Sequence, residues 1–137
     1  MNAALRQSDI ASWRGGRAIF EWFDGQTDFH DAEISDYDLG LGGDGYIKIR
    51  HWRVTGELDE AGFYRRDREA HVTLFLTDIR STDLRDDKSK QTVIFHLVLE
   101  RGAEGVELSW DSSVGVSGRI LARDVHFELT PIGRQGE

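Results

Sequence analysis

Apolar and polar residues alternate with a period of two over most of the chain after residue 31. The clearest run is 71–79, where Val72, Leu74 and Leu76 fall on one face and polar or aromatic residues on the other. Successive side chains of a β-strand point to opposite faces, so this alternation predicts a strand with one buried face. The same criterion predicts strands at residues 32–39, 46–54, 92–100, 106–110 and 119–130.

Glycine-rich and charged segments separate these strands. Residues 40–45 predict a tight hairpin turn, because glycine adopts the positive φ angles that such a turn needs. Residues 102–105 predict a second turn, and the small residues at 112–118 predict a turn or a bulge. The charged segments 55–69 and 80–91 lack an apolar period. We expect a long loop or a hairpin tip at the first and a solvated loop at the second.

The first 25 residues read differently from the rest. Ser8 is placed to cap a short helix that carries Ile10 and Trp13, and the pattern from Arg17 to Phe23 favours a second helix. Nearby aromatic residues are expected to pack against the sheet. The whole pattern predicts a mainly β protein: an antiparallel sheet, sandwich or partly open barrel of six to seven strands with short N-terminal helical segments.

Length and composition limit the class of protein. With 137 residues, 39% of them hydrophobic, the chain is expected to form a single domain over residues 1–137. The lack of cysteine excludes disulfides, thiol catalysis and thiolate metal sites. No apolar run approaches the roughly 20 residues that cross a bilayer, and the N-terminus has no apolar signal-peptide core. We therefore expect a cytoplasmic protein without membrane contact.

The formal net charge of -8 is unevenly distributed. Seven acids and no Lys or Arg lie between Asp24 and Asp44, which argues against nucleic acid as a partner and favours a basic protein. Within this window the residues predicted to bind a partner are Asp28, Asp36, Asp38 and Asp44. The alternative is that the acids merely solvate a strand edge and two turns. A competing basic surface, formed by Arg65, Arg66 and Arg68, would prefer an acidic partner.

Ionisable side chains that could catalyse a reaction or bind a metal are most concentrated from Phe29 to Glu33, where the aromatic segment meets the first predicted strand. His30 and Glu33 could both bind a metal on one helical turn, but residues three apart on a strand point to opposite faces. We therefore interpret Phe29, His30, Asp31 and Glu33 as a structural motif, and predict no catalytic residue, metal or cofactor. Asp31 is expected to accept hydrogen bonds from nearby backbone N–H groups.

No other catalytic pattern emerges from the sequence. The remaining histidines, at positions 51, 71, 96 and 126, share no ligand spacing. Ser117 lacks the strand–turn–helix context of a nucleophile elbow, and the glycines at 40–45 lie between two strands instead of opening a helix. A metal-dependent enzyme or small-ligand binder that uses His30, Asp31 and Glu33 is retained as an alternative.

The string Phe-His-Asp-Ala-Glu at 29–33, preceded by a glycine and followed by strands, resembles immunity protein family 50 of bacterial polymorphic toxin systems. Residues 72–79 are similar to that family's central apolar strand. Ser113, Gly115, Gly118, Ile120, Ala122 and Val125 are similar to its closing turn and last strand. Gln26, Thr27 and Asp28 depart from it, because the family has a Trp-Pro or similar pair there. The resemblance implies a small cytoplasmic protein that binds a toxin domain and performs no chemistry.

The leading hypothesis is thus a non-enzymatic binding protein that occludes a toxin through an acidic surface. A third hypothesis, besides the metal or ligand site, is a structural or oligomeric interaction domain. In that case an exposed strand edge would pair with a second copy to form a homodimer.

Overall fold

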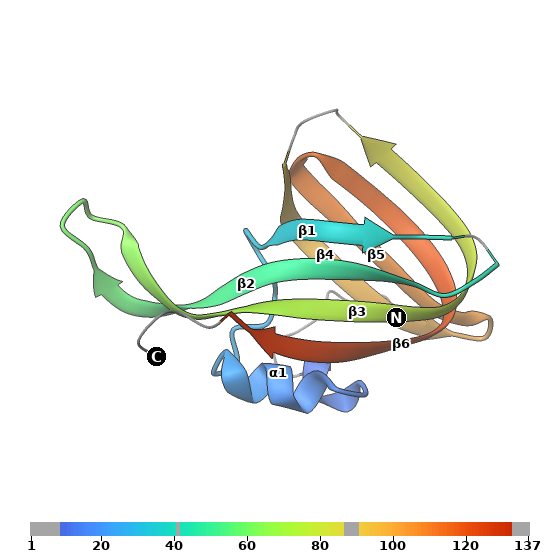
Figure 1. The fold of residues 1–137 in the computed structure, drawn as a ribbon, viewed down its shortest axis with the longest axis horizontal. Helices are drawn as coiled ribbons and strands as arrows, with labels where there is room; N and C mark the ends of the chain where they lie inside the picture. The colour runs from blue at the N-terminus through green and yellow to red at the C-terminus, as the bar shows by residue number, and fades with distance from the viewer. Residues whose placement is uncertain (1–8, 41, 87–90, 133–137) are drawn as a thin grey trace.

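The computed structural model describes residues 9–40, 42–86 and 91–132. It consists of a 3-10 turn η1 (Asp9–Ser12), a helix α1 (Gly16–Trp22) and the strands β1 (Glu33–Asp38), β2 (Gly45–Leu58), β3 (Tyr64–Asp86), β4 (Thr92–Gly102), β5 (Gly105–Val114) and β6 (Val116–Pro131). All paired strands are antiparallel, and the order β1-β2-β3-β6-β5-β4 closes into a ring because β1 also pairs with β4 (Figure 1). The prediction of a mainly β, antiparallel fold with short N-terminal helical segments is confirmed.

The strands after β1 are longer than their apolar patterns predict. The prediction of a loop at 80–91 is wrong for residues 80–86, where β3 continues to pair with β6, after a register shift between Ile79 and Ser81, as far as Asp86 opposite Val116. Residues 87–90 lie outside the described residues. The segment 55–69 forms a β-hairpin. The turn or bulge predicted at 112–118 is shorter than expected: β5 ends at Val114, β6 begins at Val116, and only Gly115, with a φ of 91°, lies between them.

Alternating side chains of the strands fill the interior of the ring. Ile47 and Ile49 of β2 point inward, as do Val72, Leu74 and Leu76 of β3, and all five are buried. The buried set continues on the other strands with Ile94, Leu97, Leu99, Val106, Leu108, Trp110, Ile120, Ala122, Val125 and Phe127. Burial of one such large apolar side chain stabilises the fold by about 1.5–3 kcal/mol, so this inner face is the main source of stability.

Residues 9–32 pack against β6 and the core. Ile10, Ile19 and Phe23 are fully buried, which confirms that this segment covers part of the sheet (Figure 1). The backbone N–H of Phe127 donates a hydrogen bond to the carbonyl of Arg14 over 2.8 Å. The N-terminal segment is therefore joined to β6 by main-chain pairing as well as by apolar contact.

The β2–β3 hairpin extends beyond the ring. β1 pairs with β2 only as far as Arg50, and β6 pairs with β3 only from Ala70 onward. Residues 53–67 therefore form a two-stranded extension, hereafter the arm, which projects from the body of the molecule (Figure 1).

Candidate functional site

The four acids predicted to bind a partner lie along β1 and at both of its ends. Asp36 and Asp38 are exposed and two residues apart on β1, so they share one face of the strand. Asp28 precedes the strand and Asp44 lies in the turn that follows it. Six residues of strand span about 20 Å. The structure thus brings Asp36 and Asp38 together and spreads the other two to opposite ends; we call these four residues the acidic face.

Three of these carboxylates are held by local hydrogen bonds. The Tyr46 hydroxyl donates to Asp36 over 2.8 Å, and this bond to a carboxylate raises the pKa of Tyr46. The backbone N–H of His30 donates to Asp28, and that of Asp78 donates to Asp44. Such bonds orient a carboxylate without neutralising its charge.

Two other acids of the window, Asp24 and Glu33, lie close to arginines, whereas the acids of the acidic face form no such pair with a described residue. Arg53 lies 3.8 Å from Asp24, and Arg50 lies 3.8 Å from Glu33. Across residues 9–40, 42–86 and 91–132, no Lys or Arg forms an ion pair with Asp28, Asp36, Asp38 or Asp44. The fold therefore compensates part of the window's charge, through the β1–β2 hairpin and the N-terminal segment, and leaves these four charges to act on solvent or a partner.

Phe29 is the buried member of the Phe29–Glu33 motif. Its side chain is fully buried and meets the ring of His51 edge-on, with ring centroids 4.9 Å apart. Phe23 contacts the same imidazole from another direction at 4.7 Å. Phe29 thereby ties the N-terminal segment to the inner face of β2.

His30 and Asp31 are exposed, and they attach the segment to carbonyl groups of β4, His30 through its ring and Asp31 through its main-chain N–H. His30 Nδ1 lies 3.0 Å from the carbonyl oxygen of Phe95, which raises the pKa of His30. The N–H of Asp31 donates to the Ile94 carbonyl. The carboxylate that accepts a backbone N–H is that of Asp28, and the Asp31 carboxylate instead lies 3.7 Å from His30 Nε2.

His51 is a core histidine. Its Nε2 donates to the Gln26 carbonyl over 2.8 Å, while the buried Nδ1 has no hydrogen-bond partner among the described residues. Burial lowers the pKa of His51 below its ordinary value of about 6.5, so the ring is mostly neutral in the folded protein at neutral pH.

This burial predicts acid sensitivity. Below about pH 6.5 the unfolded chain gains a proton at His51 that the folded protein takes up only at lower pH, so the free energy of unfolding should fall as the pH decreases. His51→Gln cannot titrate but can still donate to Gln26, so it should remove the His51 part of the slope. His71, whose pKa is also lowered by burial, should leave a remainder of the same sign. Urea unfolding across this pH range provides the measurement. An unchanged slope in His51→Gln would show that other groups cause the acid sensitivity.

The potential metal ligands do not converge. Glu33 accepts a hydrogen bond from the Gln91 amide over 2.6 Å and faces Arg50, and His126 stacks on Phe75 at 5.0 Å. In the part of the chain that the structure describes, no group of three or more His, Asp, Glu or Cys side chains is arranged to hold a metal ion. The alternative site at His30, Asp31 and Glu33 therefore receives no support from the geometry.

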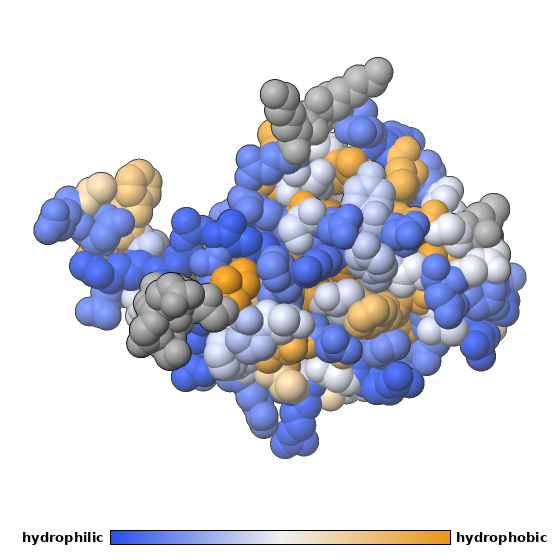
Figure 2. All heavy atoms as spheres, viewed as in Figure 1, coloured by the Kyte–Doolittle hydropathy of each residue, from blue (hydrophilic) through white to orange (hydrophobic). Residues whose placement is uncertain are grey.

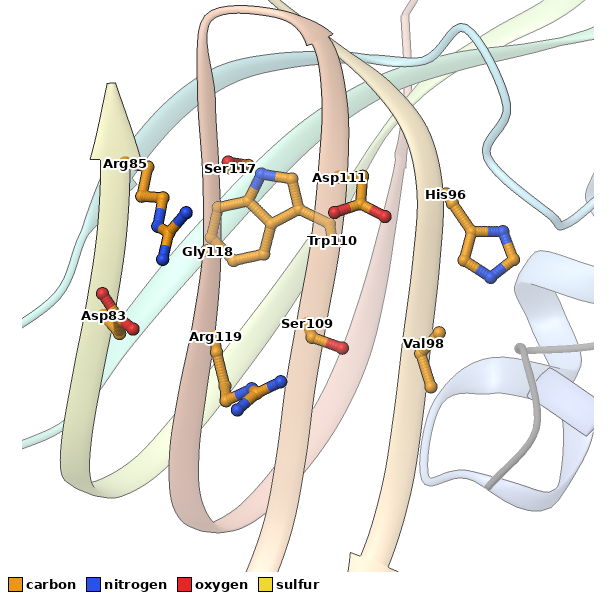
Figure 3. Close-up of a pocket in the computed structure, with 10 residues that line it drawn as sticks. All are labelled: Asp83, Arg85, His96, Val98, Ser109, Trp110, Asp111, Ser117, Gly118 and Arg119. Atoms are coloured by element: carbon orange, nitrogen blue, oxygen red, sulfur yellow. The ribbon is translucent and has the colours of Figure 1, made fainter. Parts of the chain in front are cut away.

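A depression of about 370 Å³ lies across the outward faces of β3, β6, β5 and β4 (Figure 3). Its charged residues are of both signs, with Asp83 and Arg85 on β3, Arg119 on β6 and Asp111 on β5. Ser117 and His96 also line it. They lie on β6 and β4 with β5 between them, so about 10 Å separates their backbones. This spacing argues against a serine–histidine catalytic pair.

The stem of the arm, which is its end nearest the ring (residues 53–54 and 65–67), is held by hydrogen bonds to the N-terminal segment and between its own two strands. The Gln26 side chain donates to the Val54 carbonyl and accepts from the Val54 N–H, at 2.9 and 2.7 Å. Arg53 donates to both oxygens of Asp67, which lowers the pKa of that carboxyl group. The indole N–H of Trp22 donates to the carbonyl of Arg68. These bonds fix the direction in which the arm leaves the ring.

The tip of the arm is ordered by its own turn and exposes apolar side chains. One oxygen of Asp59 accepts from the N–H groups of Ala61 and Phe63, both at 2.9 Å, and Asp59 N–H donates to the Phe63 carbonyl. Phe63 is 71% exposed, Tyr64 63% and Leu58 58%. Figure 2 shows the arm as a separate lobe on which apolar and charged residues lie side by side. Contiguous exposed apolar side chains of this kind mark interaction surfaces.

A groove of about 1000 Å³ follows the side of the arm that faces β1. Trp52 and Val54 contribute apolar lining, and the Arg66 guanidinium stacks on the Trp52 ring at 4.3 Å from its centroid. Sequence reasoning identified the arginines of this segment but missed the groove and the exposed tip. The signal for the tip was the pair Phe63 and Tyr64, two aromatics inside an otherwise charged segment.

Comparisons with other proteins place no further constraint on the site. None of the described helices is long and apolar enough to cross a membrane. Searches of protein-family models, of curated proteins and of solved structures find no match to this chain.

Proposed function

We propose that this protein is a non-enzymatic binding protein that captures a basic protein partner at the acidic face. The observation that carries the proposal is that Asp28, Asp36, Asp38 and Asp44 keep their charge uncompensated while their neighbours Asp24 and Glu33 are paired with arginines. Surface charges of one sign raise the rate at which an oppositely charged partner is encountered.

The partner in this proposal is a bacterial toxin domain of basic, nuclease-like charge, which the protein neutralises by occlusion in the cytoplasm. The resemblance of the Phe29–Glu33 string to immunity protein family 50 supports a toxin as the partner. The placement of the acids along one strand and its two ends supports a broad contact rather than a small-ligand site.

The test is binding to the protein encoded beside this chain in its source genome, because immunity genes lie next to their toxins. Isothermal titration should show a stoichiometric complex, and co-expression should protect cells from the toxin. The variant with Asp28, Asp36, Asp38 and Asp44 all changed to Asn should bind at least about tenfold more weakly, since it loses the whole charge of the acidic face.

A matched control changes four exposed acids elsewhere, Asp83, Glu104, Asp111 and Glu128, to their amides. This control alters net charge by the same amount and should retain affinity, and both variants should keep the wild-type melting temperature because exposed substitutions change stability little. If both variants lose the same affinity, binding depends only on the net charge of the protein, and the proposal that the partner binds at the acidic face is wrong.

A further inference from the structure

The arm exposes more apolar surface than its own strands can cover. A two-stranded hairpin has marginal stability in water, and here β1 and β6 both end their pairing before the arm begins. Yet the backbone of the tip is ordered by the hydrogen bonds from the N–H groups of Ala61 and Phe63 to Asp59. The side chains of Leu58, Phe63 and Tyr64 on this ordered backbone remain exposed. An ordered tip with exposed apolar side chains indicates a surface that is buried when a partner binds.

Charge changes sign along the arm. From Val54 to Tyr64 the only charged residues are three acids at the tip: Glu57, Asp59 and Glu60. Just beyond them, Arg65 and Arg66 at the stem are exposed and form no ion pair with any described residue. The arm thus has a negative end and a positive stem.

We propose that two copies of this chain associate through their arms, which lie antiparallel about a two-fold axis with the tip of each against the stem of the other. In this arrangement the acids at one tip face Arg65 and Arg66 of the second copy, and the same contacts recur by symmetry. A parallel arrangement would place like charges together and is disfavoured. This inference goes beyond the proposed function and uses a surface other than the acidic face.

The groove supplies the apolar complement to the tip. The groove lining carries both signs of charge and includes Phe63 and Tyr64 of the same arm. Of its acids, Glu33, Glu69 and Asp67 are paired with Arg50 or Arg53, whereas Arg65 and Arg66, beside Trp52 and Val54, form no ion pair with a described residue. A tip that enters at the stem therefore brings Phe63 against apolar lining and its acids against these two guanidinium groups. The same polypeptide therefore contains both the apolar, acidic tip and the apolar, basic stem that complements it. Because a contact between two hairpins is small, we expect a dimer with a dissociation constant of roughly micromolar order.

Sedimentation of the full chain at concentrations from about 1 to 500 µM tests the proposal. The wild type should shift with concentration from the 15.6 kDa of the chain to twice that mass. Reversal of the stem (Arg65→Glu with Arg66→Glu) or of the tip (Glu57→Lys with Glu60→Lys) should each raise the dissociation constant at least about tenfold. A 1:1 mixture of the two variants should form heterodimers, because each negative arm then meets a positive one.

Apolar and functional controls complete the experiment. Phe63→Ser with Tyr64→Ser should abolish the dimer, whereas Phe95→Ser, at a side chain 57% exposed on β4, should not. Changing the acidic face to Asn should leave dimerisation intact, so failure of this inference and failure of the proposed function are separable. A wild type that stays monomeric at the highest concentration overturns the proposal, as does a mixture of reversed variants that forms no heterodimer.

Discussion

Replacing Phe29 with alanine should lower the free energy of unfolding by about 3–5 kcal/mol, which is the usual cost of truncating a fully buried phenylalanine. The side chain has no exposed surface, and it meets His51 edge-on at 4.9 Å. Domains of this kind are stable by only about 5–15 kcal/mol, so the variant should be close to unfolding at physiological temperature. Urea unfolding followed by tryptophan fluorescence gives the measurement.

The neighbours of Phe29 provide the control. His30 and Asp31 are exposed. The main-chain bond of Asp31 to β4 survives truncation of its side chain, so Asp31→Ala should cost less than about 1 kcal/mol. His30→Ala loses the exposed bond from the ring to the Phe95 carbonyl and should cost no more than about 1.5 kcal/mol. If either costs as much as Phe29→Ala, the division of the motif into one core residue and two surface residues is wrong.

Replacing Gly15 with alanine should destabilise the protein by about 3 kcal/mol or more, the range expected for backbone strain combined with a steric clash. Gly15 has a φ of 81°, and a Cβ there would lie 1.9 Å from the carbonyl oxygen of Phe127. The substitution pushes the N-terminal segment away from β6 and breaks the bond from Phe127 N–H to the Arg14 carbonyl. A lower melting temperature by circular dichroism should report the loss.

Gly40→Ala and Gly102→Ala are the matched substitutions, because a Cβ at either position meets open space. Both should stay within about 0.5 kcal/mol of the wild type. A Gly15→Ala variant as stable as these two would mean that η1 and α1 do not depend on their close approach to β6.

The period-two pattern was sufficient to predict the strands whose inner face is apolar. It failed at residues 80–86, where every side chain is exposed and Leu84 is the only large apolar one, and where pairing with β6 sustains the strand. Closure of the ring also could not be predicted from local sequence patterns. It rests on two residue pairs between β1 and β4, Glu33 with Val93 and Ile34 with Thr92, which lie about sixty residues apart in the chain.

The acidic window could be read from the sequence, but the distinction among its acids could not. Arg50 and Arg53 of β2 approach Glu33 and Asp24 only after the hairpin and the N-terminal segment have folded. The role of Asp28 was likewise hidden, since its bond to the His30 N–H depends on local backbone geometry. Which acids of residues 24–44 remain without a cationic partner is therefore decided by the fold, and it cannot be read from the sequence of this segment.

The rate of association with the proposed partner, the product of the gene beside this one, measured over a salt series, tests the central claim most directly. The variant with Asp28, Asp36 and Asp38 changed to Asn should associate about tenfold more slowly at low salt and depend less on salt, because exposed charges act on encounter and are screened within about 8 Å at physiological ionic strength. A variant with Arg65, Arg66 and Arg68 changed to Gln should associate as fast as the wild type. If only the arginine variant is altered, the capture surface is the arm, the partner is acidic, and the proposed role of the acidic face is wrong.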